Sequence, residues 1–250
     1  MNCRDSSGRA AAAAFIVVAS LGATASGQKV QAPPMQPSQS GYVPPTPRIP
    51  TGPTVKLAAP KPKGTISVEQ ALWGRRSLPS ATQGQITIED AGQLVWAAQG
   101  VTGKWGRRAA PSAGGAYPLE VLLVAGDVAG LPAGLYRYYG AQHALERIAD
   151  GDKRPELAQI SRFQGIDRAP ALIVITGIES RSTKFFPNET VARNHVAIEA
   201  GAASQNVALE AVGLGLGTAV LGGWDEPKLL QALHLPPEEQ PFVVLVVSRP

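Results

Sequence analysis

Hydrophobic residues recur at helical spacing in two long stretches of the chain. Within residues 88–100 the apolar positions that share one helical face are Ile88, Ala91, Leu94, Val95 and Ala98. The alanine-rich stretch 191–214 repeats the pattern with Val196, Ala200, Ala203, Val207, Ala211 and Leu214. Both stretches are predicted to be helices. Gly201 lies inside the second helix, where we expect its lack of a side chain to allow close packing or the approach of a planar ligand.

Helix start signals agree with these periods. Ser67 is followed three residues later by Gln70, the spacing of a capping box. Thr87 is placed to cap the helix that Gly100 ends. Asp225, with Pro227 in the first turn, predicts another helix. The polar segment 152–163 is also expected to be helical.

Runs of β-forming residues lie between the helices. Residues 119–126 and 134–139 are joined by a short connection containing glycine and proline, which favours antiparallel pairing, and 144–148 adds a third strand. The continuous apolar run 170–177 is typical of a buried central strand. Further strands are expected at 218–221 and 242–248. Because no regular βαβ repeat is present, we predict an α+β fold with helices packed on a mainly antiparallel central sheet.

The N-terminus carries the pattern of an export signal. Arg4 and Arg9 precede an apolar run over residues 10–21, and Ala23-Thr24-Ala25 offers a small-x-small cleavage site. We predict a signal peptide over residues 1–25 and an exported, periplasmic or secreted protein. The alternative is an uncleaved anchor, although the run is shorter than the ~18–20 apolar residues that span a bilayer. No later segment is long enough for a membrane span.

Residues 26–63 are rich in proline. Such a segment has few backbone donors and little apolar mass, so we predict a disordered tether followed by one folded domain over residues 64–250. A ligand for a proline-recognition domain is the alternative interpretation. The prolines are Pro33, Pro34, Pro37, Pro44, Pro45, Pro47, Pro50, Pro53, Pro60 and Pro62.

Charge and rare residues exclude several classes of function. The net charge of +4 comes from scattered pairs such as Arg75-Arg76, without a basic stripe interleaved with aromatic residues, so nucleic-acid binding is not expected. Cys3 is the only cysteine, which excludes disulfides and thiolate sites after signal cleavage. His143, His195 and His234 lack ligand spacing, and no metal site is predicted.

The remaining polar residues match the needs of a flavin mononucleotide (FMN). A phosphate requires cations, for which Arg75, Arg76 and Arg249 are candidates. Ser77 and Ser112 offer hydroxyls to the ribityl chain. Gly222-Gly223 offers amides that no Cβ obstructs. Taken one at a time, the arginines are equally explained as solvated surface residues and the glycines as a turn.

Three blocks of sequence stand out, and the second and third of them are long and specific: "QLVWAAQGVTG" at 93–103, "RRAAPSAGGAYPLE" at 107–120 and "EAGAASQNVALEAVGLGLG" at 199–217. Together they resemble the nitroreductase family, and within it the SagB-type dehydrogenase branch. The similarity covers nearly all of residues 64–250, in the same order, including the closing "SRP". It implies an FMN-dependent oxidoreductase that acts on a small-molecule substrate, usually as a homodimer with the flavin between protomers, and NAD(P)H as a donor.

The resemblance also implies roles for single residues. Arg75 and Ser77 match ligands of the phosphate and ribityl chain, with Arg76 beside them. Arg249 matches the C-terminal cation of the phosphate clamp. The other matches are the loop of Pro111 and Ser112, which meets the partner's flavin, and Gly222-Gly223, whose amide faces flavin N5.

Three positions depart from the pattern of the family. Pro79 stands where many relatives have a second basic residue, and Ala202 replaces a histidine. Lys184 is a candidate catalytic base or substrate-orienting residue, with a solvated loop lysine as the alternative, but Phe185 lacks the phenol of a lysine-tyrosine pair. Two other functions therefore stay open: a non-catalytic flavin- or ligand-binding envelope protein, and an interaction module.

Overall fold

The computed structural model describes residues 46–250, so the predicted signal peptide and residues 26–45 lie outside the described residues. Within this part a seven-stranded sheet has the order β1-β6-β5-β3-β7-β9-β8, and every neighbouring pair is antiparallel. A short parallel pair, β2 with β4, stands apart. The strands are β1 (Thr54–Lys56), β2 (Ile86–Thr87), β3 (Leu119–Ala125), β4 (Val128–Ala129), β5 (Gly134–Tyr139), β6 (Ala144–Asp150), β7 (Ala171–Gly177), β8 (Gly217–Leu221) and β9 (Gln240–Ser248).

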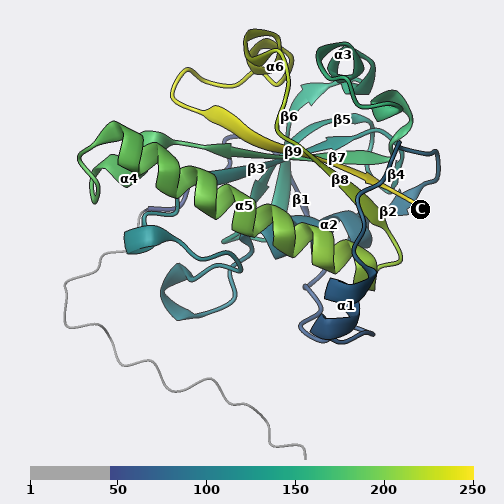
Figure 1. Cartoon of the computed structure of the whole chain (residues 1–250), viewed down its shortest axis with the longest axis horizontal. Helices are drawn as coiled ribbons and strands as arrows, with labels where there is room; N and C mark the ends of the chain where they lie inside the picture. The colour runs from purple at the N-terminus through teal and green to yellow at the C-terminus, as the bar shows by residue number, and fades with distance from the viewer. Residues whose placement is uncertain (1–45) are drawn as a thin grey trace, which may run out of the picture. The chain divides into compact units, whose positions relative to one another are not determined.

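Helices cover both faces of the sheet (Figure 1). They are α1 (Val68–Gly74), α2 (Ile88–Gln99), α3 (Arg154–Ile160), α4 (Glu179–Thr183), α5 (Glu189–Gly213) and α6 (Glu226–Ala232), with 3-10 turns η1 (Lys104–Gly106), η2 (Ala113–Gly115) and η3 (Ile166–Arg168). The long helix α5 and helix α2 pack on one face, and α3 and α6 on the other. Among the described residues no helix is both long and apolar enough to cross a membrane.

The central strands are apolar on both sides because both of their faces are covered. In β3, Val121 and Leu123 pack toward α2 and α5, whereas Leu122 and Val124 pack toward the α3–α6 side. All seven residues of β7 are buried as well. This double burial explains the continuous apolar run from which the central strand was predicted. The α+β class and the mainly antiparallel sheet are confirmed.

The capping residues act as the sequence predicted. The Ser67 hydroxyl accepts a hydrogen bond from the Gln70 amide, and the Gln70 side chain accepts one from the Ser67 amide. Thr87 caps α2 with Asp90 in the same reciprocal way. Gly100 ends α2 in an extended conformation rather than a left-handed one. Glycine is required there for a different reason, since a Cβ would lie 2.0 Å from the Trp96 ring.

The predicted boundary at Gly64 is too late. Residues 46–63, which the proline content assigned to the tether, pack on the domain: β1 pairs with β6, and Leu57 is buried. The Lys61 amide donates to the Gln93 side chain at 2.9 Å. Residues 54–56 lie in the longest proline-free interval of the segment, 54–59, so they retain the amides that an edge strand needs.

Candidate functional site

The edge strand β8 positions the first predicted motif. Ser77 forms a parallel bridge with Thr218, and the Leu78 amide donates to the Thr218 carbonyl at 3.0 Å. β9 lies on the other side of β8, where Ser248 is opposite Gly217. The residues after α1 are therefore held one strand spacing from β8 and two from the C-terminal strand, about 10 Å.

Hydrogen bonds tie the C-terminal arginine to the same place. The Thr82 amide donates to the Ser248 hydroxyl at 3.0 Å, and the Thr82 hydroxyl donates to the Arg249 carbonyl at 2.8 Å. The Arg249 guanidinium donates to the Gln85 carbonyl through Nε and Nη2. Its Cδ would lie 3.1 Å from a Cβ on Gly84, whose φ of +142° favours glycine. Arg249 is thus fixed beside the loop that follows Ser77.

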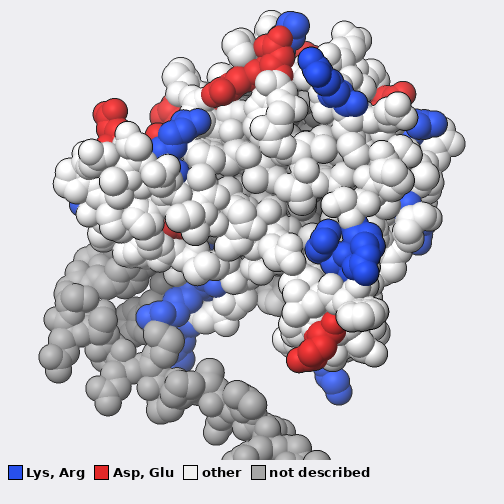
Figure 2. Space-filling view, in the orientation of Figure 1, with Lys and Arg blue, Asp and Glu red and all other residues white. Residues whose placement is uncertain are grey.

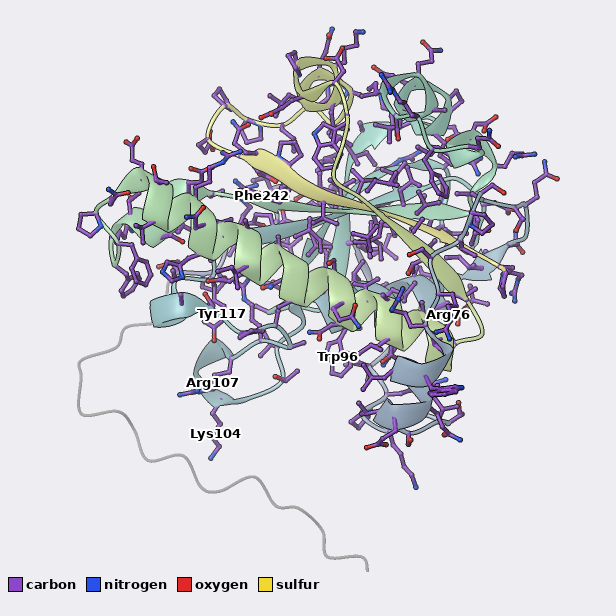
Figure 3. The ribbon with its side chains drawn as sticks, in the orientation of Figure 1. Arg76, Trp96, Lys104, Arg107, Tyr117 and Phe242 are labelled. Carbon is purple, nitrogen blue, oxygen red and sulfur yellow. The ribbon has the colours of Figure 1, made fainter. Side chains whose placement is uncertain are left out.

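The predicted phosphate cations are not neutralised by carboxylates. Arg75 is half-buried at the end of α1, and exposed Arg76 donates from Nη1 to the Trp73 and Arg75 carbonyls. Within residues 46–250, no carboxylate forms an ion pair with Arg75, Arg76 or Arg249. Figure 2 shows a blue patch over the end of α1, where Figure 3 labels Arg76. These residues can bind an anion.

Gly222 and Gly223 follow directly after β8 and are exposed. A Cβ built on either one meets no described atom within 4 Å, and neither has a left-handed φ. The fold of this chain therefore does not itself require glycine at these two positions. From Thr218 to Gly222 the strand advances about 13 Å. Strand β8 therefore has exposed glycine backbone after its C-terminal end, whereas the cations lie beside its N-terminal end.

The loop of Pro111 and Ser112 is anchored to the middle of α5. The Ser112 hydroxyl accepts from the Tyr117 amide at 2.8 Å, and the Ala113 amide donates to Glu199 Oε1 at 2.8 Å. Glu199 is 4% exposed, and its Oε2 has no partner in the described part of the chain. Burial raises the pKa of Glu199, and the Ala113 amide, the Ser112 hydroxyl and the charge of Arg108 oppose this in part.

Glu199 is a residue that the sequence reasoning missed. It falls at helical spacing between Val196 and Ala203, on the face that was recognised as apolar. A carboxylate on a buried helix face usually has a specific role, because it must either be hydrogen-bonded or take up a proton. A glutamate within the apolar face of this helix was therefore the feature by which the sequence could have indicated Glu199.

Lys184 is exposed at the end of α4. The next residue, Phe185, packs over Gly114, where an added Cβ would lie 3.0 Å from its ring. Phe186 stacks on His195 with ring centroids 4.1 Å apart. Lys184 therefore belongs to the group formed by the loop 111–117 and the first turns of α5.

The structure divides the predicted site residues into two groups. At the C-terminal end of α5, Val212 lies 3.2 Å from the position of a Cβ on Gly74, which places Arg75, Arg76, Ser77 and Arg249 there. Glu199, which holds the loop of Pro111 and Ser112, lies 13 residues earlier on α5, roughly 20 Å away. One chain does not bring the two groups together.

Comparison with known proteins identifies the family of the chain. The model of the nitroreductase family matches residues 74–248. A protein of Methanocaldococcus jannaschii named as a nitroreductase is 32% identical over 185 residues, which cover 74% of this chain and 91% of that protein.

Solved structures give the same result. A Ralstonia eutropha structure described as a nitroreductase superposes with a TM-score of 0.69 at 29% identity, over 84% of this chain and 95% of that one. A chain of the Escherichia coli microcin synthetase complex shares the fold, with a TM-score of 0.60 at 22% identity over 81% and 78% of the two chains. Because the family model matches the chain from the end of α1 to the end of β9, the chain belongs to the nitroreductase family.

Proposed function

We propose that this nitroreductase-family oxidoreductase is FMN-dependent and passes hydride or electrons through flavin N5 between a donor, NAD(P)H among them, and a small substrate. A dehydrogenation of the SagB type is included in this proposal. The proposal rests on one observation: cations that form no ion pair with a carboxylate of residues 46–250 lie at one end of β8, and open glycine backbone lies at the other. Along β8, the cations would bind the phosphate of a planar cofactor and the glycine backbone would contact its ring.

The residues present fit FMN in charge and in shape. Arg75, Arg76 and Arg249 would hold the phosphate, and the exposed hydroxyl of Ser77 would bind the ribityl chain. The Gly222-Gly223 amides would lie against the ring, where a side chain would keep it away. When bound, FMN supplies the hydride- and electron-accepting chemistry, and the protein supplies binding and orientation.

A homodimer would complete the site. In a two-fold pair with antiparallel α5 helices, the loop of one protomer lies near the C-terminal end of its partner's α5. The loop of Pro111 and Ser112 would then meet the partner's cations and glycines. The outward face of α5 suits such contact, because Ile198 is 68% exposed and a Cβ on Gly201 would meet no described atom within 4 Å. This open space replaces the close packing within one chain that we expected at Gly201.

Lys184 is the protein group proposed for proton delivery or substrate orientation at this shared site. It is exposed beside the loop 111–117, and its neighbour Phe185 has no hydroxyl to relay a proton. A chemistry that needs little acid-base help from the protein is therefore favoured. We further propose that the chain is exported and that cleavage near Ser26 releases it into the periplasm or the medium.

The test is an absorption spectrum of the purified protein, followed by heat release and identification of the chromophore. We expect about one FMN per protomer. The double variant Arg75→Ala with Arg249→Ala loses charge-assisted bonds of about 1.5–3 kcal/mol each, so FMN should bind at least about a hundredfold more weakly. Arg107→Ala with Arg162→Ala, two exposed arginines elsewhere, removes the same charge and should retain FMN.

Two results would contradict the proposal. Full FMN occupancy in the Arg75/Arg249 double variant would exclude the clamp. A wild-type protein that neither contains FMN nor binds added FMN would exclude the cofactor. A yellow protein that is not reduced by NADH, NADPH or any other donor tested would instead favour the non-catalytic flavin-binding function.

A further inference from the structure

We propose that a cavity distinct from the proposed flavin-binding residues of the same chain binds a small aromatic carboxylate. It has a volume of about 400 Å³ and lies between the end of α2, the start of β3, the end of β5 and the loop after α2. The side chains that carry the argument are Arg48, Arg108, Tyr117, Glu120, Tyr138 and Tyr139.

Arg108 supplies a positive charge that Glu120 and Glu199 offset only at a distance, without an ion pair. Its Nη1 donates to Gln99 Oε1 at 3.0 Å and to the Leu119 carbonyl at 3.3 Å, and both acceptors are neutral. No carboxylate among residues 46–250 forms an ion pair with it. Burial lowers the pKa of Arg108, with Glu120 opposing, but an arginine keeps its charge. A partly desolvated cation of this kind is stabilised by an anion.

The carboxylates nearest to the cavity are already paired with other groups. Glu239, which is fully buried, accepts from Arg137 at 2.9 Å and from Arg48 at 3.2 Å. Glu120 accepts from Arg181 at 2.6 Å and lies 3.7 Å from Arg137. Each of these carboxylates thus faces two guanidiniums. Because Arg48, Arg137 and Arg181 share these two carboxylates, Glu120 is too well neutralised to repel a bound anion strongly, and Arg108 adds a further positive charge at the cavity.

The other residues that line the cavity favour an aromatic ring in the ligand over a second polar group. The guanidinium of Arg108 lies 4.9 Å from the centre of the Tyr117 ring. The Tyr138 hydroxyl is engaged with His143 at 2.9 Å, and the Tyr139 hydroxyl donates to Glu146. Burial raises the pKa of both tyrosines, so both stay neutral at pH 7. With the hydroxyls engaged, the rings offer apolar and π contacts to a planar ligand.

The cavity is distinct from the proposed flavin site of the same chain. In the sheet β5 is separated from β8 by β3, β7 and β9. At about 4.8 Å per strand, the tyrosines of β5 lie roughly 19 Å across the sheet from Ser77's partner strand. The inference does not depend on whether the protein binds FMN.

Calorimetric titration of the full chain with 2-naphthoate tests the proposal, with uncharged 2-naphthamide as the matched ligand. We expect naphthoate to bind at least about tenfold more tightly than naphthamide, as a charge-assisted bond implies. Arg108→Gln removes the cation, and Ala141→Phe blocks the cavity from an exposed lining position without changing any charge. Both variants should lose this preference or the binding itself. Arg107→Gln, the exposed neighbour that does not line the cavity, should bind as the wild type does.

If Arg108→Gln fails to fold, Ala141→Phe still tests the proposal. Wild-type protein that shows no preference for the carboxylate would overturn the proposal. So would binding that survives Ala141→Phe and Arg108→Gln. Binding that persists in both variants and shifts the absorption of bound flavin would place the ligand at the flavin instead. If the Arg75/Arg249 double variant loses FMN but still binds naphthoate, the naphthoate site is independent of the proposed flavin site.

Discussion

Glu199 shows how one side chain can hold a functional loop. Its carboxylate lies on the buried face of α5 and receives the Ala113 amide, so the loop of Pro111 and Ser112 is fixed relative to the helix. A burial that leaves one carboxylate oxygen without a partner costs stability when the group is charged. The cost is accepted at a place where a loop must be held precisely, which is common at functional sites.

The raised pKa of Glu199 makes a pH-dependent prediction. Because the folded-state pKa lies above the unfolded value, the native state binds this proton more tightly, and stability falls as pH rises from the ordinary glutamate pKa of 4.5 through the folded pKa. Glu199→Gln cannot ionise, so its free energy of unfolding should rise relative to wild type over that window. Each unit of raised pKa corresponds to about 1.4 kcal/mol.

Urea unfolding of both proteins from pH 4.5 to 8 measures this difference. Glu238→Gln, at an exposed position, serves as the control and should follow the wild-type curve. A difference between Glu199→Gln and wild type that stays constant with pH would show that Glu199 does not titrate abnormally.

At the scale of elements, the segment before α1 is part of the domain. β1 adds an edge strand beside β6, and Arg48 reaches the fully buried Glu239 at 3.2 Å. The edge strand is short and bounded by prolines, which limits unwanted pairing with other chains. Composition alone could not reveal this, because the partners of β1 lie about 90 residues later in the sequence.

Removing this segment should destabilise the domain. A chain of residues 64–250 loses β1 and one cation of a buried ion pair, so we expect it to be less stable than residues 46–250 by on the order of 2–3 kcal/mol. Arg48→Met in the longer chain removes the ion pair with Glu239 but keeps β1, so it distinguishes the contribution of the ion pair to stability from that of the strand. Chemical unfolding monitored by tryptophan fluorescence gives the comparison, and equal stability of the two chains would restore the boundary at Gly64.

At the scale of the whole molecule, the division of the site residues between the middle and the C-terminal end of α5 predicts an obligate dimer. Ile198→Glu places a charge on the outward face of α5, where Ile198 is 68% exposed. The variant should elute as a monomer in size-exclusion chromatography with light scattering and should lose FMN with its partner, while the fold is preserved in circular dichroism.

Ile49→Glu is the matched control, since Ile49 is 66% exposed and precedes β1. It should remain dimeric and yellow. A monomeric Ile198→Glu protein that still holds one FMN per chain would show that the site is complete within one protomer.

The sequence by itself determined the elements and the family of this protein. Capping boxes at Ser67 and Thr87 and the apolar runs of β3, β7 and β9 are local patterns, so helices, central strands and fold class could be predicted. The resemblance to the family further implied Arg75, Ser77 and Arg249 as site residues, because each matches a position of the family pattern that can be located along the chain.

Only the tertiary structure decided which of these residues meet. Ser77 reaches Thr218 across about 140 positions, and Arg48 reaches Glu239 across 191. It also decided that Glu199 is buried, that Arg108 forms no ion pair with a carboxylate of residues 46–250 and that the glycines after β8 are open. Burial and charge compensation depend on contacts between distant segments, and neither is encoded in the local period of a chain.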